Sequence, residues 1–229
     1  MILKKTIFIL STLLLTTSSI ADTSKIKDNF FSSIESFLDG NFEDTEFTLK
    51  SAEGLKPQIG ILTLKPLIDN DDGLTFFQGS FFTHDGDRET LNLGLGKRMF
   101  NADESIMFGL NAFYDHELDY DHQRTSLGAE IKSSILELNT NHYFGISGEQ
   151  TGKNNIKEEV ADGYDLEFGA HVPYMPTAKM YAKIFEYDIP GGLDYEGIEY
   201  SSNIGIPNSG TNFEVGYKDY GNNGYDDQW

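Results

Sequence analysis

Apolar and polar residues alternate with a period of two along most of the chain, from about residue 43 to residue 220. Leu91, Leu93 and Leu95, for example, alternate with Asn92 and Gly94. Successive side chains of an extended strand point to opposite faces, so the pattern predicts strands with one apolar and one polar face. The expected strands cover residues 43–51, 57–66, 74–83, 89–99, 105–116, 124–133, 135–147, 162–172, 178–187, 194–205 and 211–220.

Turn-forming residues separate the expected strands. Runs rich in Asp, Asn, Gly and Pro occupy residues 69–73, 101–103, 190–192 and 207–210, and such runs favour tight reversals. The one long connection, roughly residues 148–161, is expected to be a loop. Strands joined by short turns are antiparallel, so the expected fold is an all-β, antiparallel up-and-down sheet.

Two classes of protein fit an alternating all-β chain. A secreted sandwich buries its apolar faces, but its strands usually have about five or six residues. The strands expected here have about ten residues, the length that a tilted strand needs to cross a membrane. Phe and Tyr also gather near expected strand ends, as at Phe82, Tyr143 and Tyr187, where an aromatic girdle would lie. The pattern therefore favours a transmembrane β-barrel, and the sandwich is the alternative. In one strand Phe113 departs from the alternation, because it falls on the polar side.

The N-terminus resembles a secretory signal. Two lysines precede an apolar stretch at residues 6–15, and the small residues Ser19 and Ala21 allow cleavage before Asp22. The apolar stretch is short for a transmembrane helix, although an N-terminal anchor helix is an alternative. After it there is no run of about 18 apolar residues, which argues against a helical membrane protein.

A different period follows the signal. From Ile26 to Leu38 apolar residues recur every four positions, which predicts a short amphipathic helix. The expected organisation is a signal peptide at residues 1–21, a helical segment at residues 22–42 and a β-domain at residues 43–229.

Composition narrows the possible functions. The formal net charge of −20 argues against nucleic-acid binding, because phosphate contacts require a basic surface. Removal of residues 1–21 takes away two lysines and no acid, which moves the charge from −20 to −22. With no cysteine the chain has no disulfide framework and no thiolate metal site. Aromatic residues make up 13% of the chain, which argues against disorder.

Several strings, in this order, carry a resemblance to a known family. They are Thr90–Arg98 (TLNLGLGKR), Phe108–Glu117 (FGLNAFYDHE), Arg124–Glu130 (RTSLGAE), Gly163–Phe168 (GYDLEF) and Tyr174–Lys183 (YMPTAKMYAK). Together they resemble the translocator barrel of the intimin/invasin family, the inverse autotransporters. The similarity runs from about Phe30 to Gln228.

The resemblance implies a transmembrane β-barrel of the twelve-strand type in the outer membrane of a Gram-negative-type bacterium, with a short periplasmic helical segment before it. It also implies partners: outer-membrane lipid, the barrel-assembly machinery, periplasmic chaperones and an exported C-terminal passenger. The expected function is a membrane anchor and translocation pore for an adhesin-like passenger that is absent from this chain. The alternative is a small stand-alone barrel, acting as a cation-preferring pore or a surface protein without a passenger.

The number of strands departs from the family pattern. The alternation supplies eleven strands, and the residues after Tyr225 do not alternate. An antiparallel barrel needs its last strand to pair with its first, because open edges are costly in lipid. We therefore expect the last strand to be missing from this chain, or closure on ten strands without residues 43–51.

If the apolar faces meet lipid, the alternating polar and small residues face a lumen. The expected lumen-facing residues are Asn92, Gly94, Gly96, Arg98, Gly109, Asn111, Asp115, Gly128, Glu130, Lys132, Glu137, Asn139, Asn141, Asp165, Glu167, Gly169, His171, Glu214 and Lys218. Acids outnumber bases in this set, so an open water path would favour cations. The alternative is a packed interior in which the bases pair with the acids.

The richest group of titratable residues lies between Asp115 and His122. Such a group can serve as a cation site, a transition-metal site or an Asp–His pair for hydrolysis. A solvated acidic loop explains the same residues, and we prefer that interpretation. We expect no catalytic residue, no cofactor and no metal, because nothing in the sequence demands an enzyme.

Overall fold

The computed structural model describes residues 44–50, 58–71, 73–84, 88–206, 211–221 and 224–228. The expected signal peptide and helical segment lie outside these residues. None of the described residues forms a helix long and apolar enough to cross a membrane. The strands are β1 (Asp44–Lys50), β2 (Gln58–Asn70), β3 (Gly73–His84), β4 (Arg88–Phe100), β5 (Ile106–Glu117), β6 (His122–Ser133), β7 (Leu136–Gly145), β8 (Gln150–Thr151), β9 (Lys157–Glu158), β10 (Asp162–Val172), β11 (Met175–Asp188), β12 (Tyr195–Ile206) and β13 (Thr211–Asp219).

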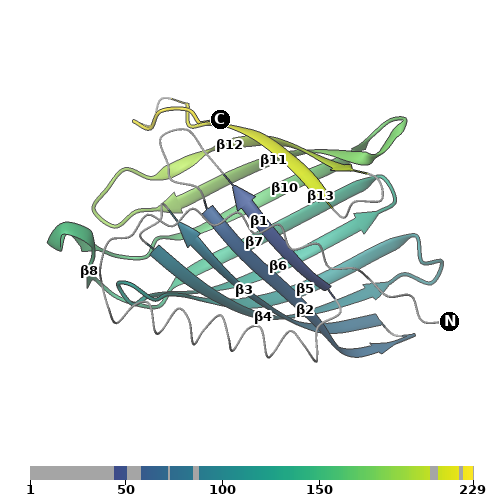
Figure 1. The fold of residues 1–229 in the computed structure, drawn as a ribbon, viewed down its shortest axis with the longest axis horizontal. Helices are drawn as coiled ribbons and strands as arrows, with labels where there is room; N and C mark the ends of the chain where they lie inside the picture. Colours follow the sequence, from purple (N-terminus) through teal and green to yellow (C-terminus); the bar gives the residue numbers. More distant parts are fainter. Residues whose placement is uncertain are drawn as a thin grey trace. The chain divides into compact units, whose positions relative to one another are not determined.

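Eleven of these strands form one sheet. Its order is β1-β2-β3-β4-β5-β6-β7-β10-β11-β12-β13, and β8 and β9 form a separate two-stranded sheet. Every neighbouring pair is antiparallel, so the main sheet runs up and down in chain order (Figure 1). The expected all-β, antiparallel up-and-down architecture is confirmed. Among the described residues no pairing joins β1 to β13, so the sheet is not closed.

Two details of the expected strands were wrong. Strand β2 continues to Asn70, past Pro66, where the end of a strand was expected. The pairing of β2 with β3 shifts register between Pro66 and Ile68, and such an irregularity lets a proline stay in a strand although it lacks an N–H group.

The second correction concerns the connection at roughly 148–161, which was expected to be a loop. It contains β8, β9 and a 3-10 turn at Lys153–Asn155. Strands of two residues are too short to show a period of two. Asn154 and Asn155 adopt left-handed conformations, with φ of 58° and 59°, and asparagine tolerates this conformation better than most residues.

The two faces of the main sheet have opposite character. Leu110 and Leu127 are 62% and 59% exposed, whereas Glu130 and Asp165 on the other face are 8% and 7% exposed. We call these the apolar face and the polar face. A soluble sandwich has the reverse arrangement, with leucines covered and carboxylates in water.

Glycines on the polar face make room for large side chains of the neighbouring strand. Gly94 lies opposite Phe113 and Gly96 lies opposite Phe76. A Cβ atom at either glycine would overlap the opposing ring, so each ring lies over a bare stretch of backbone, as in aromatic rescue of glycine. The same cross-strand arrangement joins Gly163 with Tyr187 and Gly169 with Tyr181. It also explains why Phe113 interrupts the alternation: its ring fills the space that Gly94 leaves.

Candidate functional site

The polar face of the sheet carries the charged side chains of the candidate site. Its first group joins Arg98 on β4 with Glu130 and Lys132 on β6. The Nε atom of Arg98 donates to Glu130 Oε1 at 2.6 Å, and Lys132 Nζ lies 2.8 Å from Glu130 Oε2. The Arg98 guanidinium also lies 4.9 Å from the centre of the Phe76 ring. One largely buried carboxylate is thus balanced by two bases.

A second group is built around Asp115 on β5. Arg124 on β6 donates to Asp115 Oδ2 through Nε at 2.9 Å and through Nη2 at 2.7 Å. Asn92 on β4 donates to the other carboxylate oxygen. The Arg124 guanidinium lies 4.4 Å from the ring centre of Tyr143 on β7, which places a cation over an aromatic face. Tyr143 in turn donates its hydroxyl proton to Asp165 Oδ2 at 2.7 Å, which extends the group to β10.

A third group lies on the later strands. Lys179 on β11 pairs with Glu137 on β7. Glu199 on β12 lies 2.9 Å from Lys183 and 3.6 Å from Lys218. These contacts link strands β7, β11, β12 and β13 through charges. Pairs that are partly withdrawn from water gain more from Coulomb attraction than exposed ones.

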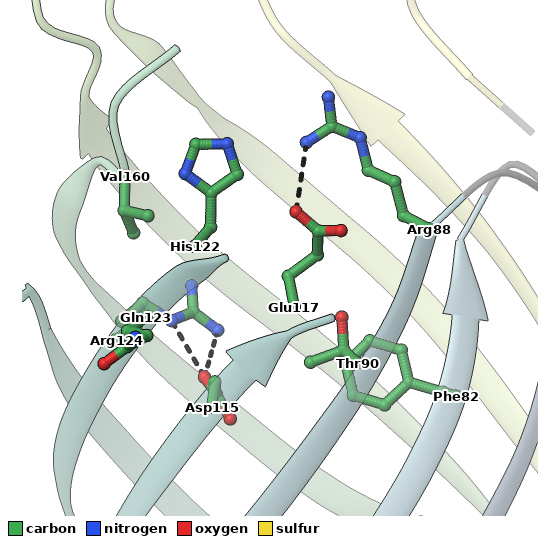
Figure 2. A pocket seen from close by; sticks show the side chains of 9 residues that line it. All are labelled: Phe82, Arg88, Thr90, Asp115, Glu117, His122, Gln123, Arg124 and Val160. Atoms are coloured by element: carbon green, nitrogen blue, oxygen red, sulfur yellow. Dashed lines mark hydrogen bonds and ion pairs between the residues drawn. The ribbon is translucent and has the colours of Figure 1, made fainter. Parts of the chain in front are cut away.

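A small pocket lies where β4 begins, β5 ends and β6 begins. Its volume is about 210 Å³, and Arg88, Glu117 and His122 line it. Figure 2 shows these three side chains rising from neighbouring strand ends, with a dashed line between Arg88 and Glu117. Arg88 Nη1 lies 3.9 Å from Glu117 Oε2. Glu158 of β9 accepts a hydrogen bond from Arg88 Nη2 at 2.6 Å and lies 3.3 Å from His122 Nε2.

The environment of Glu158 shifts its titration. Partial burial raises the pKa of this carboxyl, but the hydrogen bond and charge of Arg88, with a smaller effect of His122, outweigh burial and hold the pKa below its ordinary value. Glu158 is therefore ionised at neutral pH and attracts both bases.

The structure places most of the expected lumen-facing residues on the polar face. Several are brought into contact: Asn92 with Asp115, Arg98 with Glu130 and Lys132, Asn139 with Glu167, and Asn141 with Asp165. The glycines Gly94, Gly96, Gly109, Gly128 and Gly169 are buried there, and Asn111, Glu137 and Lys218 are buried or half-buried. His171 is half-buried, whereas Glu214 is exposed.

Sequence reasoning placed Glu117 and His122 in a candidate titratable group but did not assign them to this face. The charged residues that it missed altogether are Arg88, Arg124, Lys179, Lys183 and Glu199 on the main sheet, and Glu158 on β9. Arg124 and His122 have the same parity as Gly128 and Glu130, so continuing the alternation toward the start of β6 would have found them. Glu158 had no such signal, because its position depends on the path of a long connection.

The cluster between Asp115 and His122 is divided between the two faces. Asp115 and His116 are adjacent in a strand and point in opposite directions. His116 Nε2 lies 2.7 Å from Asp121 Oδ1. Hydrogen bonds from Gln123 and then from His116 lower the pKa of Asp121. In the part of the chain that the structure describes, no group of three or more His, Asp or Glu residues is arranged to hold a metal ion.

Fold and site together define an all-β class: an antiparallel up-and-down sheet whose exposed face is apolar and whose covered face is ion-paired. The protein-family model described as inverse autotransporter, β-domain, matches residues 16–206 of this chain. The chain therefore belongs to the inverse autotransporter family, and the resemblance to intimin and invasin is confirmed.

Individual relatives agree with this assignment. The chain is 31% identical over 135 residues to an attaching and effacing protein homolog of Escherichia coli K12, which covers 58% of this chain and 43% of that protein. It is 29% identical over 152 residues to intimin of Escherichia coli O111:H-, covering 66% of this chain and 16% of intimin. With invasin of Yersinia enterocolitica it shares 30% over 135 residues, covering 58% and 15%. The chain thus spans less than half the length of these relatives.

A solved structure has the same fold. It is described as "Unveiling the Mechanism Behind the in-meso Crystallization of Membrane Proteins", and it superposes with a TM-score of 0.70 at 23% identity, covering 80% of this chain and 79% of that chain.

Proposed function

We propose that this chain forms the outer-membrane β-barrel of an inverse autotransporter, which anchors and exports an extracellular adhesin-like passenger lying outside this chain. The observation that carries the proposal is the apolar face. Large side chains such as Leu95, Leu110 and Leu127 are 55%, 62% and 59% exposed. Leaving a leucine side chain in water rather than burying it costs about 1.5–3 kcal/mol, so a row of them requires an apolar surrounding.

The dimensions of the strands support a membrane location. Strands β4, β5 and β6 have 13, 12 and 12 residues, and a tilted strand needs about 9–11 residues to cross the hydrocarbon layer. The excess places a residue or two at each end in the interfacial region. We infer that the polar face lines the lumen, because carboxylates such as Glu130 and Asp165 would be unfavourable if they faced lipid.

Barrel closure requires a partner for the edge strand β13. The backbone of Lys218 already exchanges two hydrogen bonds with Gln228, at 2.8 and 3.1 Å, in an antiparallel bridge. This bridge supports closure by a strand that pairs with β13 from Gln228 onward, as in a barrel of the twelve-strand type. Closure on ten strands without β1 is the alternative.

The stand-alone cation-preferring pore has weaker support. The pore interpretation rests on an excess of acidic residues in the lumen. Four acids on the polar face each pair with at least one base, namely Asp115, Glu130, Glu137 and Glu199. The function we propose is anchoring and export, which requires no catalytic residue.

The test is expression in a Gram-negative host of the full-length protein with an epitope in the segment that follows the barrel. We expect the protein in the outer-membrane fraction, a shift in gel mobility on heating and cleavage of the epitope by protease added to intact cells. Leu127→Arg should reduce assembly, because arginine at the bilayer midplane costs about 2–4 kcal/mol. The control Gly148→Arg adds the same charge in a connection where no atom lies within 4 Å of the new Cβ. Recovery of the folded protein from the periplasm without detergent would overturn the proposal.

A further inference from the structure

The connection between β7 and β10, residues 146–161, is a small self-supporting hairpin. Gln150 and Thr151 pair with Glu158 and Lys157. Gly152 N donates to the carbonyl of Ile156 at 2.8 Å, closing the hairpin tip. The hairpin therefore keeps its own shape and can move as one unit.

The hairpin is tied to strands that are not its neighbours. Glu158 reaches Arg88, the first residue of β4, at 2.6 Å. In the sheet β4 is separated from β7 by β5 and β6, and neighbouring strands lie about 4.8 Å apart, so the tie spans roughly 14 Å along the sheet. The contact of Glu158 with His122, the first residue of β6, lies on the same path. A connection that stood away from the sheet could not make these contacts, so the hairpin leans across the strand ends on the polar face.

The pocket beneath the hairpin leaves some of its buried polar atoms without a hydrogen bond among the described residues. Val160, just after β9, lines it together with Glu117 and His122 (Figure 2). Glu117 Oε2 and His122 Nδ1 are buried and make no hydrogen bond among the described residues. A buried polar atom without a hydrogen bond is unfavourable, and both atoms would regain water if the hairpin lifted.

Few contacts oppose that movement. Besides the contacts of Glu158, the hydrogen bonds between the described residues that join the hairpin segment to the sheet run from Ile146 N and Ser147 N to Gln123 O and from Gln123 N to Ser147 Oγ. These bonds lie at the base of the hairpin, next to β7, where they can act as a hinge. The tip side is held by the Glu158 contacts.

We propose that residues 146–161 are a lid over this end of the polar face, and that Glu158 is its latch on Arg88 and His122. The proposal goes beyond anchoring and export, and it rests on the proposed barrel only in taking the polar face as the wall of a lumen. Arg88 keeps its place when the latch opens, because it also lies 3.9 Å from Glu117 and 5.1 Å from the Tyr120 ring centre.

The natural absence of cysteine allows a direct test. Val160→Cys places one thiol in the pocket, and its rate of modification by a charged, membrane-impermeant maleimide reports access. The rate is measured in the folded full chain in three backgrounds: unchanged, Glu158→Ala and Glu149→Ala. Glu149 is the matched control, because it lies on the same hairpin, is exposed and, among the described residues, forms its ion pair within the hairpin, with Lys157 at 3.2 Å.

We expect Glu158→Ala to speed modification by about tenfold, as a locally opened state would, and Glu149→Ala to leave the rate unchanged. Arg88→Met removes the latch from the sheet side and should raise the rate in the same way. Equal rates in all backgrounds, or an equal rise with Glu149→Ala, would overturn the lid. The membrane-bound fraction of each sample is measured in parallel. A protein that stays soluble contradicts the barrel but leaves the comparison of rates valid for the lid.

Discussion

The pairing of Gly94 with Phe113 predicts a strong coupling between two substitutions. A Cβ atom at Gly94 would overlap three atoms of the Phe113 ring, so Gly94→Ala forces the ring out of its place. Overpacking of this kind costs about 1–3 kcal/mol. When the ring is removed first, the same substitution relieves the entropic cost of glycine in a strand and stabilises by about 0.5–1 kcal/mol.

The coupling energy between Gly94→Ala and Phe113→Ala should therefore be about 1.5–4 kcal/mol, in the upper part of the range for contacting residues or above it. The assay is equilibrium unfolding in urea of the protein in phospholipid vesicles, with the folded and unfolded gel bands as the readout. Gly148→Ala is the control, because nothing lies within 4 Å of its Cβ position and the substitution should be neutral. Free energies that add to within about 0.5 kcal/mol would refute the reasoning, because independent sites behave in that way.

Two further predictions concern the charged groups. Asp115→Ala leaves Arg124 without its carboxylate on the polar face and should lower the free energy of unfolding by about 3 kcal/mol. His116→Ala should lower it by less than about 1 kcal/mol, because the partner of His116, Asp121, is exposed. Equal losses of unfolding free energy would contradict the assignment of these neighbours to opposite faces. Because the pKa of Glu158 is held below its ordinary value of 4.5, the contribution of Glu158 to holding the lid is present above that value and is lost as the pH falls through the lowered pKa. The rate at which the maleimide modifies Val160→Cys is divided, at each pH, by the rate for Gly148→Cys, an exposed cysteine that corrects for titration of the thiol itself. This ratio should rise as the pH falls through the lowered pKa of Glu158. A ratio that stays constant would contradict the latch.

The fold could be predicted from the sequence because one physical signal dominates it. Each strand covers one face with apolar and the other with polar side chains, and in strands such as β4 and β10 the alternation persists over ten residues or more. The strand expected at 57–66 instead continues to Asn70, because the register shift beside Pro66 accommodates a residue that lacks an N–H group. The strands β8 and β9 were missed because two residues carry no period.

A residue of the candidate site could be predicted only where its position in the alternation assigns it to one face of the sheet. Alternation placed Asp115, Glu130 and Asp165 on one face, and all three are buried there. Which base reaches which acid depends on the stagger between strands, which the alternation does not fix, so the Asp115–Arg124 and Lys179–Glu137 pairs were not foreseen. The contact of Glu158 with Arg88 could not be predicted for a further reason, because 70 residues separate them along the chain.

The central claim is that the apolar face meets lipid and the polar face does not. The most direct test is a tryptophan scan through β5 in vesicles containing brominated lipids, which quench tryptophan fluorescence on contact. The chain has one tryptophan, so Trp229→Phe provides a dark background for Leu110→Trp, Asn111→Trp and Ala112→Trp. We predict strong quenching at positions 110 and 112 and little at position 111, following the alternation of the two faces. Equal quenching at all three positions, or none at any, would contradict a membrane-spanning strand with these faces.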